Sequence, residues 1–202
     1  MLFSLIENLE KVDIILASAS PRRFELLKTM GLEFKVIVSK VHEDSIDPNN
    51  LIDGVTANAR RKGLDVATQH PYDLVICADT VVVTDSVILG KPRDENEAFR
   101  MLQELSGKTH RVITAFGLIF QKYEKSLFDQ EITEVTFRTL HEDEIWAYIN
   151  TGEPMDKAGA YAIQGQGAVL IEKIQGCYFN VVGFPLTKFY LRINDFFQDF
   201  VL

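Results

Sequence analysis

An apolar run extends from Leu74 to Val83, and one charged residue, Asp79, interrupts it. A run this long and this rich in β-branched residues predicts a buried strand. A carboxylate inside such a strand costs free energy unless a metal ion, a cation or backbone donors compensate its charge. Because ligands bind at strand ends in open α/β sheets, Asp79 is a candidate functional group. The alternative is a turn aspartate between the two strands of a hairpin, and this run alone does not decide between them.

Length and composition bound the class of protein. The chain has 202 residues, of which 47% are hydrophobic and 25% charged, which suits one large globular domain or two small lobes. A formal net charge of -8 disfavours a nucleic acid polymer as partner, because such binders are usually basic. Cys77 and Cys177 lie in apolar or aromatic surroundings without CxxC spacing, so we expect buried free thiols in a reducing compartment.

The N-terminal stretch from Met1 to Lys11 is amphipathic and carries acids among its apolar residues. It lacks the basic region and the cleavage site of a signal peptide. No apolar run in the sequence approaches the length that spans a membrane. We therefore expect a soluble cytoplasmic protein without a membrane partner.

A strand-to-helix turn near the N-terminus is the first candidate for anion binding. Asp13 to Ala17 predicts a strand, and the next helix begins at Pro21 with Ser20 as its N-cap. The free N–H groups and the positive dipole end of such a helix suit a phosphate. Arg22 and Arg23 add permanent charges with forked donors. The alternative is an ordinary capped helix with two solvated arginines.

An acidic loop and a helical lysine follow. Residues 34–38 predict a short strand, and the polar loop that follows carries Glu43, although acidic loops of this kind are usually only solvated. From Leu51 to about Thr68 the pattern is helical. On the helix face that carries Lys62 the other residues are Val55, Ala59 and Val66. Lys62 therefore either extends to water or points into a cleft toward an anion.

A second lysine follows the long apolar run. Residues 87–89 predict a strand that pairs with that run through a turn at 85–86, which makes a hairpin. Lys91 then lies between Gly90 and Pro92, where the backbone cannot be helical. A lysine held in this way is better placed to bind an anion than a mobile surface lysine.

The rest of the chain predicts further helices and strands without a repeat or a linker. Asp94 caps a helix that ends at Gly107, with Glu97 at the capping-box position. The expected elements after it are a strand at 111–120, a turn at 122–129, a strand at 130–140, a helix at 142–150, a strand at 168–174 and a closing helix at 186–200. We expect one domain over residues 1–202, with its weakest internal boundary near residue 110.

Residues 154–167 form a loop of small and polar residues that also contains Tyr161 and Ile163. The backbone of a glycine-rich loop can approach a ligand closely, although a tight structural turn is the alternative. The chemical candidates so far are two acids, four cations and one helix N-terminus. Zinc-type His or Cys spacing, a Walker motif, a GxGxxG motif and a Ser-His-Asp order are all absent from the sequence. Oxygen ligands together with several cations fit Mg²⁺ and a polyphosphate.

Five motifs occur in the order typical of one family: LASASPRR at 16–23, ADT at 78–80, GKP at 90–92, LSG at 105–107 and DKAGAYAIQG at 156–165. With them the chain closely resembles the Maf (septum-formation inhibitor) family, from about Asp13 to the final helix. The resemblance implies a nucleoside triphosphate pyrophosphatase that cleaves between the α- and β-phosphates with a divalent metal. It also implies an α/β fold, with a mixed twisted sheet split over two lobes around a central cleft, similar to the inosine triphosphate pyrophosphatases.

The resemblance assigns catalytic roles by motif. Asp79 matches the family's essential acid, described as the proton acceptor, and Glu43 matches the acid of the loop after the second strand, with Asp44 as its substitute. Glu43 and Asp79 are the implied ligands of the metal, Mg²⁺ or else Mn²⁺ or Co²⁺. Lys62 and Lys91 match the lysines that hold phosphate.

The resemblance also implies a substrate-binding set: Ser18, Ser20, Arg22, Arg23, Thr80 and Gln164. Of these, Arg22, Thr80 and Gln164 match positions associated with base selection. The Ser-Pro-Arg-Arg start and the Ala-Tyr-Ala-Ile-Gln-Gly loop resemble the dTTP/UTP branch, so we expect dTTP and UTP as substrates. The alternatives are a 7-methylguanosine triphosphate pyrophosphatase, from whose motifs this chain departs, and a non-catalytic nucleotide-binding regulator of cell division. The resemblance allows a homodimer, and no stretch of the sequence identifies an interface.

Overall fold

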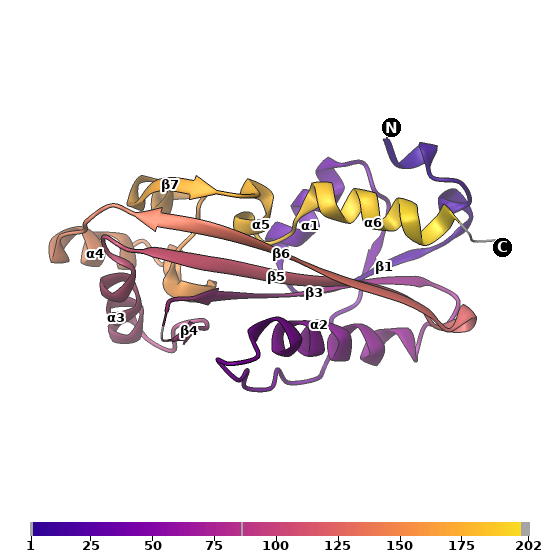
Figure 1. Cartoon of the computed structure of the whole chain (residues 1–202), viewed down its shortest axis with the longest axis horizontal. Coiled ribbons are helices and arrows are strands. Elements are labelled where there is room, and N and C mark those ends of the chain that lie inside the picture. Colours follow the sequence, from indigo (N-terminus) through magenta and orange to yellow (C-terminus); the bar gives the residue numbers. More distant parts are fainter. Residues whose placement is uncertain (1, 86, 199–202) are drawn as a thin grey trace. The chain divides into compact units, whose positions relative to one another are not determined.

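The computed structural model of the protein describes residues 2–85 and 87–198. Its strands are β1 (Ile14–Ala17), β2 (Lys35–Val36), β3 (Leu74–Val83), β4 (Ile88–Leu89), β5 (Thr109–Phe120), β6 (Lys125–Phe137) and β7 (Ile171–Gln175), shown in Figure 1. Its α-helices are α1 (Pro21–Thr29), α2 (Leu51–Ala67), α3 (Glu95–Leu105), α4 (Glu142–Ile149), α5 (Tyr178–Val182) and α6 (Leu186–Gln198). The 3-10 turns are η1 (Leu2–Leu5), η2 (Leu9–Lys11), η3 (Gln121–Tyr123), η4 (Glu153–Asp156), η5 (Ala158–Ala160) and η6 (Gly165–Leu170).

The strands form one mixed sheet in the order β2-β1-β3-β5-β6-β7, and β4 pairs with β3 beside this path. β1 runs parallel to β2 and to β3, with Ile14 opposite Leu74 and Ala17 opposite Cys77. β4 runs antiparallel to β3, and β7 runs antiparallel to β6. The expected α/β class with a mixed sheet is therefore confirmed, as is the hairpin partner of the long apolar strand.

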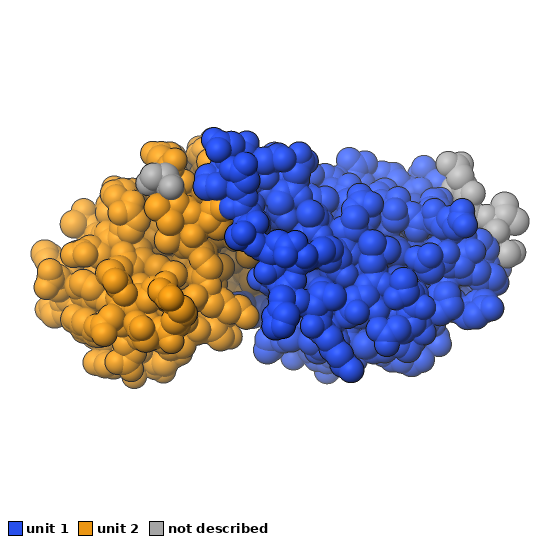
Figure 2. Space-filling model, turned by 90° about the horizontal axis from the view of Figure 1, so that it is seen from below, with its two compact units in different colours: residues 1–79, 114–131, 183–202 blue, residues 80–113, 132–182 orange. Residues whose placement is uncertain are grey.

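The chain divides into two compact units, drawn in different colours in Figure 2. The first unit consists of residues 1–79, 114–131 and 183–202, and the second of residues 80–113 and 132–182. Each unit combines segments that are far apart in sequence, because β3, β5 and β6 each begin in one unit and end in the other.

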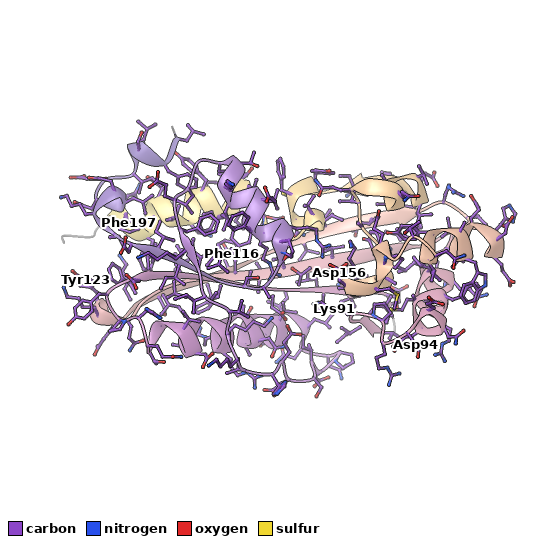
Figure 3. The ribbon with its side chains drawn as sticks, turned by 180° about the vertical axis from the view of Figure 1, so that it is seen from behind. Lys91, Asp94, Phe116, Tyr123, Asp156 and Phe197 are labelled. Atoms are coloured by element: carbon purple, nitrogen blue, oxygen red, sulfur yellow. The ribbon has the colours of Figure 1, made fainter. Side chains whose placement is uncertain are left out.

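In the first unit, α2 lies on one face of the sheet, and α1 and α6 lie on the other (Figures 1 and 3). The apolar stripe that the sequence predicts on α2 is buried, since Val55, Ala59 and Val66 are covered completely or almost so. On the opposite face, the rings of Phe116, Phe184 and Phe189 lie 5.0 to 6.0 Å apart between their centroids. Burial of these apolar surfaces orients α2, and with it Lys62.

The second unit has its own core. Buried residues of α3, β5, β6 and α4 pack against the glycine-rich loop, and they include Leu102, Val112, Phe137 and Ile149. Tyr161 of the loop belongs to the same core. Because Tyr161 is a member of this core, the loop is anchored from inside although its tip is exposed. In the part of the chain that the structure describes, no helix is both long and apolar enough to cross a membrane.

The predicted polar turn at 122–129 is wrong. The chain turns at Gln121–Glu124, and residues 125–129 already belong to β6. The polar residues at the start of β6 adopt an extended strand conformation because α6 binds their side chains. Lys125 Nζ donates to Phe196 O at 2.7 Å, and Arg192 Nε pairs with Asp129 Oδ2 at 2.5 Å. The pairing spans more than sixty residues of sequence, so the local pattern did not reveal it.

Several predicted boundaries are also wrong. The strand expected at 168–174 begins only at Ile171, because η6 includes residues 168–170, and Arg138 binds the carbonyl groups of Val169 and Leu170 at 2.8 and 3.1 Å. The strand expected at 34–38 is limited to Lys35–Val36. The closing helix is described as far as Gln198, so its expected end at Phe200 lies outside the described residues, as does Ser86 of the expected hairpin turn.

Two smaller expectations need correction. Asp94 Oδ1 accepts a hydrogen bond from Glu97 N at 2.8 Å, which confirms the N-cap. The Glu97 carboxylate, however, accepts from Arg93 N at 2.7 Å instead of the expected N-cap amide, so the capping box is shifted by one residue. Both cysteines are free, but only Cys77 is buried, because Cys177 is half-buried.

Candidate active site

Asp79 lies inside β3, so the alternative of a turn aspartate is wrong. Its Oδ1 accepts a hydrogen bond from Lys62 Nζ at 2.6 Å, and the same Nζ donates to Glu43 Oε1 at 2.5 Å. The exposed fraction is 7% for the side chain of Asp79, 15% for Lys62 and 59% for Glu43. One ammonium therefore bridges a buried and an exposed carboxylate, and Lys62 meets an anion instead of extending to water.

Burial raises the pKa of Asp79 above the usual range of an aspartate, the ion pair with Lys62 opposes this shift, and the negative charge of Glu43 adds to it. The net direction is upward. A carboxylate with a raised pKa is more basic than one in water, so Asp79 suits the role of a proton acceptor.

Helix α2 also holds the loop that carries Glu43. Asn58 is buried, and its side-chain amide binds both backbone groups of Asp44: Oδ1 accepts from N at 2.9 Å, and Nδ2 donates to O at 3.1 Å. Arg61 pairs with the Asp44 carboxylate and donates to His42 O. Asn58, Arg61 and Lys62 stand at positions i, i+3 and i+4, which lie on one face of a helix. Asn58 and Arg61 were not predicted as site residues, although their spacing from Lys62 in the sequence was a usable signal.

The N-terminus of α1 is tied to β3 by Arg23. As predicted, Ser20 caps the helix, with its Oγ accepting from Arg23 N at 3.4 Å. The buried Arg23 guanidinium donates from Nε to Gly183 O at 3.0 Å, and from Nη1 to Ser18 Oγ at 3.1 Å and Ala78 O at 3.0 Å. Burial lowers the pKa of Arg23, and the charge of the carboxylate after Ala78 opposes that shift. Arg23 thus fixes the backbone directly before the buried carboxylate.

The first unit therefore brings together Ser18, Arg23, Glu43, Lys62 and Asp79 through direct contacts or a shared backbone segment. Arg22 is half-buried in the first turn of α1, beside the cap residue Ser20.

The remaining predicted residues belong to the second unit. Thr80 follows the buried aspartate in β3 and is half-buried. Lys91, labelled in Figure 3, is exposed, and the preceding carbonyl, Gly90 O, accepts from Gly159 N at 3.0 Å. Gln164 is exposed in the loop between η5 and η6.

The acids of the first unit fit a hard divalent cation. Two carboxylates, Glu43 and Asp79, lie within hydrogen-bond distance of one ammonium. Among the residues that the structure describes, no group of three or more His, Cys, Asp or Glu could hold a metal ion. Mg²⁺ is commonly bound by one or two carboxylates together with substrate phosphates and water. The pair therefore suits a cation that binds together with a polyphosphate.

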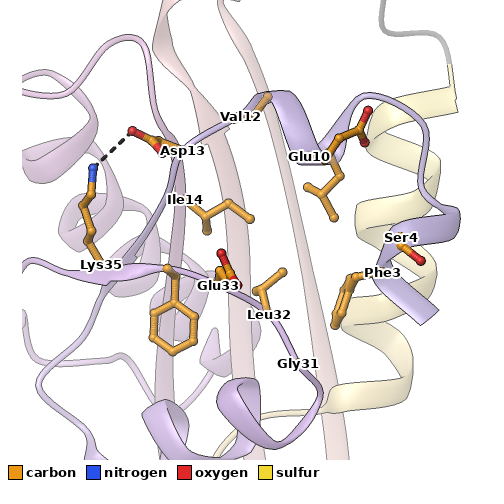
Figure 4. Close-up of a pocket in the computed structure, with 12 residues that line it drawn as sticks. Phe3, Ser4, Glu10, Val12, Asp13, Ile14, Gly31, Leu32, Glu33 and Lys35 are labelled. Atoms are coloured by element: carbon orange, nitrogen blue, oxygen red, sulfur yellow. Dashed lines mark hydrogen bonds and ion pairs between the residues drawn. The ribbon is translucent and has the colours of Figure 1, made fainter. Parts of the chain in front are cut away.

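A separate pocket of about 500 Å³ lies in the first unit (Figure 4). Phe3, Ile14 and Leu32 contribute apolar surface to it, and Asp13 and Lys35 form an ion pair of 3.1 Å at its wall. None of the predicted site residues lines this pocket, so it is distinct from the cluster around Lys62.

Comparison of this chain with known proteins identifies the family to which it belongs. A dTTP/UTP pyrophosphatase of Acetivibrio thermocellus is 47% identical over 199 residues, which cover 94% of this chain and 96% of that protein. A dTTP/UTP pyrophosphatase of Clostridioides difficile is 45% identical over 192 residues, covering 92% of this chain and 99% of that protein. The structure of a HAM1 protein from Coxiella burnetii aligns with 62% of this chain and 73% of that chain, at a TM-score of 0.43 and 14% identity. The sequence profile of Maf-like proteins matches residues 13–196. This chain therefore belongs to the family of Maf-like proteins.

Proposed function

We propose that this protein hydrolyses dTTP and UTP to the nucleoside monophosphate and pyrophosphate. The observation that carries the proposal is the Lys62 ammonium between Glu43 and the buried Asp79, in a chain whose relatives at 45% to 47% identity are named dTTP/UTP pyrophosphatase. The two carboxylates provide oxygen ligands and a base, and the ammonium provides positive charge for a phosphate.

Asp79 accepts a proton from the water that attacks phosphorus, a role that its raised pKa supports. Glu43 and Asp79 would hold Mg²⁺, Mn²⁺ or Co²⁺, which when bound supplies positive charge to the phosphate oxygens. Lys62 uses two of its three ammonium donors on the two carboxylates, which leaves the third for a phosphate oxygen. Lys91 neutralises further phosphate charge, and its exposed position leaves it accessible to substrate.

The N-terminus of α1 binds phosphate through Ser18, Ser20 and the positive end of the helix. Arg23 places positive charge beside Asp79, while its own donors hold the backbone of β3 in position. Arg22 contributes to substrate binding from the first turn of the same helix.

Base selection falls to Gln164 and Thr80, together with Arg22. The Gln164 amide both donates and accepts, so it matches the donor and acceptor on the edge of uracil or thymine. The Thr80 hydroxyl, next to the catalytic acid in sequence, supports the same contact. Cytosine reverses donor and acceptor on that edge, so a fixed amide leaves polar groups unpaired with it.

Pyrophosphate release from five triphosphates, on wild type and on Gln164→Glu, tests this function. We expect dTTP and UTP to exceed CTP, ATP and GTP by at least about tenfold in kcat/KM, which corresponds to about 1.4 kcal/mol of differential transition-state binding. Gln164→Glu should weaken this preference more than it weakens turnover, and Gln103→Glu, which adds the same charge at an exposed position of α3 in the same unit, serves as the matched control. A purine preference, or equal loss of all substrates in Gln164→Glu, would refute base reading by Gln164. No release from any nucleotide would favour a non-catalytic binding protein.

We further propose a cytoplasmic location and a homodimer. Two free cysteines in the described structure support a reducing compartment. The family resemblance supports the dimer, which sedimentation equilibrium of the full chain would test through the measured mass.

A further inference from the structure

The loop at 162–167, which presents Gln164, is held from beneath by a single carboxylate. Glu153 Oε2 accepts a hydrogen bond from Gln166 N at 3.1 Å, and Glu153 Oε1 accepts from Gly167 N at 3.1 Å. Both donors are backbone amides that follow Gln164 in the chain. The backbone on the C-terminal side of Gln164 is thereby fixed to η4.

Tyr148 of α4 holds the other side of the same loop. Its buried hydroxyl donates to Glu153 Oε1 at 2.9 Å and lies 3.1 Å from Ala162 N, from which it accepts. The backbone is therefore fixed two residues before Gln164 and again two and three residues after it. Gln164 itself is exposed between these anchor points.

Two glycines permit this close approach. Gly165 has a φ of +72°, and a Cβ atom there would lie 2.6 Å from Glu153 Oε2. A Cβ atom at Gly167 would lie 2.5 Å from Tyr148 Oη and 2.5 Å from Ala162 O. The loop backbone lies directly on the two anchoring side chains, so a shift of either side chain must move the loop.

Glu153 stays ionised in this position. Partial burial alone would raise the pKa of Glu153, but the amides of Gln166 and Gly167 and the Tyr148 hydroxyl outweigh it, so the net shift is downward. Hydrogen bonds to a charged acceptor are stronger than those between neutral groups. The charge of the Glu153 carboxylate therefore strengthens these hydrogen bonds at neutral pH, and we call Glu153 and Tyr148 the anchor of the loop.

We propose that Glu153 and Tyr148 are positioning residues for base selection, which act by fixing the backbone around Gln164. This inference rests on the proposed function, in which the Gln164 amide reads uracil or thymine. A glutamine amide that can flip or shift would accept cytosine as well, because it can exchange its donor and acceptor. Only a held loop makes the wrong base leave polar groups unpaired.

Steady-state kinetics on UTP and CTP test the proposal with Glu153→Gln and Tyr148→Phe. Glu153→Gln keeps the shape but sets an amide donor against a backbone donor, and Tyr148→Phe removes only the hydroxyl. The matched controls are Glu172→Gln and Tyr178→Phe, exposed residues of the same unit that lie outside the anchor. We expect the UTP-to-CTP ratio of kcat/KM to fall about tenfold in both anchor variants, mainly through a higher kcat/KM for CTP, and to stay unchanged in the controls. Inhibition by inorganic tripolyphosphate, which has no base, should stay within about twofold of wild type in every variant.

A double variant and amide exchange separate positioning from general damage. If Glu153 acts through Gln164, adding Glu153→Gln to Gln164→Ala should not lower the ratio further. Hydrogen exchange of the Gln166 and Gly167 amides should be faster in Glu153→Gln than in wild type. An unchanged ratio in Tyr148→Phe and in folded Glu153→Gln, with an altered ratio in Gln164→Glu, overturns the anchor and leaves the proposed function standing. A wild-type enzyme without preference for UTP over CTP overturns the base-reading function itself, and the anchor with it.

Discussion

At the residue scale, Asp79 shows how a charge can be kept inside an apolar strand. The other residues of β3 are buried except the half-buried Thr80, and the Oδ1 of Asp79 is bound by one ammonium, that of Lys62. The site therefore bears the free energy cost of a buried carboxylate in exchange for a more basic group. Arg23 is a buried cation whose charge is compensated by neutral acceptors instead. Its guanidinium donates to two carbonyl groups and a serine hydroxyl inside the unit.

We predict that Asp79→Asn keeps the fold and loses turnover by about 10³-fold, because the amide is nearly isosteric but neither charged nor basic. Pyrophosphate release and thermal unfolding would be measured together. Asp53→Asn, an exposed aspartate in the first turn of α2, is the control and should behave as wild type. Turnover of Asp79→Asn within several-fold of wild type would exclude Asp79 as the base.

His110 predicts a dependence of stability on pH. It is buried in the second unit, where Nε2 lies 2.8 Å from Tyr161 Oη, and burial lowers the pKa of His110 from 6.5 to about 4. Between these values the unfolded chain binds a proton at this residue and the folded chain does not, so acid favours unfolding. The contribution of neutral His110 to the free energy of unfolding is complete above about pH 6.5. About 3 kcal/mol of it is lost as the pH falls to about 4.

Chemical denaturation from pH 4 to 7 would measure this effect as the difference in unfolding free energy between wild type and His110→Gln. The unfolding free energy of His110→Gln should depend less on pH than that of wild type. His42→Gln, at an exposed histidine, should show the same pH dependence as wild type. Equal slopes for wild type and His110→Gln would show that His110 is protonated alike in both states.

Among the elements, α2 supports the loop at 42–44, which carries Glu43. One face is apolar and packs on the sheet, and a neighbouring face presents Asn58, Arg61 and Lys62 to the loop at 42–44. Asp65, one turn further on, continues this contact by accepting from Ser39 Oγ at 3.0 Å and Lys40 N at 2.9 Å. The position of Glu43 thus depends on a helix rather than on its own loop.

Asn58→Ala should therefore weaken the site without removing any charge. It leaves the N–H and C=O groups of Asp44 without their side-chain partner, at an expected cost of about 1–3 kcal/mol in the free energy of unfolding. A looser Glu43 should also raise the Mg²⁺ concentration needed for half-maximal activity. The control is Asn50→Ala, the same substitution at the exposed N-cap of this helix, where the asparagine side chain makes no capping hydrogen bond. Identical behaviour of the two variants would contradict this role of Asn58.

At the scale of the whole molecule, the chain has a net charge of -8 but is proposed to bind a polyanion. Local cations must therefore offset the general repulsion, and Arg22, Lys62 and Lys91 are the proposed ones. A divalent cation reduces the same repulsion, because it neutralises both the substrate and the two carboxylates.

We predict strict dependence of turnover on a divalent cation that prefers oxygen ligands. Exhaustive chelation should abolish pyrophosphate release, and addition of Mg²⁺, Mn²⁺ or Co²⁺ should restore it, because Glu43, Asp79 and the triphosphate offer only oxygen. Thermal unfolding with and without chelator serves as the control for loss of fold. Full activity in excess chelator would refute the metal role of the two acids.

Sequence patterns were sufficient to predict the features that depend on neighbours in the chain. The buried strand around Asp79, the amphipathic α2 with Lys62 on its apolar side, and the caps at Ser20 and Asp94 follow from periodicity and local hydrogen bonds. The motifs also sufficed to identify the family, which the match over residues 13–196 confirms.

The contacts between distant segments of the chain became evident only in the folded protein. β6 begins at Lys125 because α6 binds its polar residues, Arg23 binds the backbone at Ala78 and Gly183, and Glu153 binds amides thirteen and fourteen residues further along the chain. Each of these polar side chains is compatible with a solvated surface position when its sequence neighbours alone are considered. In the folded chain each of these side chains lies beside a particular carbonyl or amide group and binds it. A polar group that is buried without a partner has lost its hydrogen bonds to water without compensation, which costs free energy.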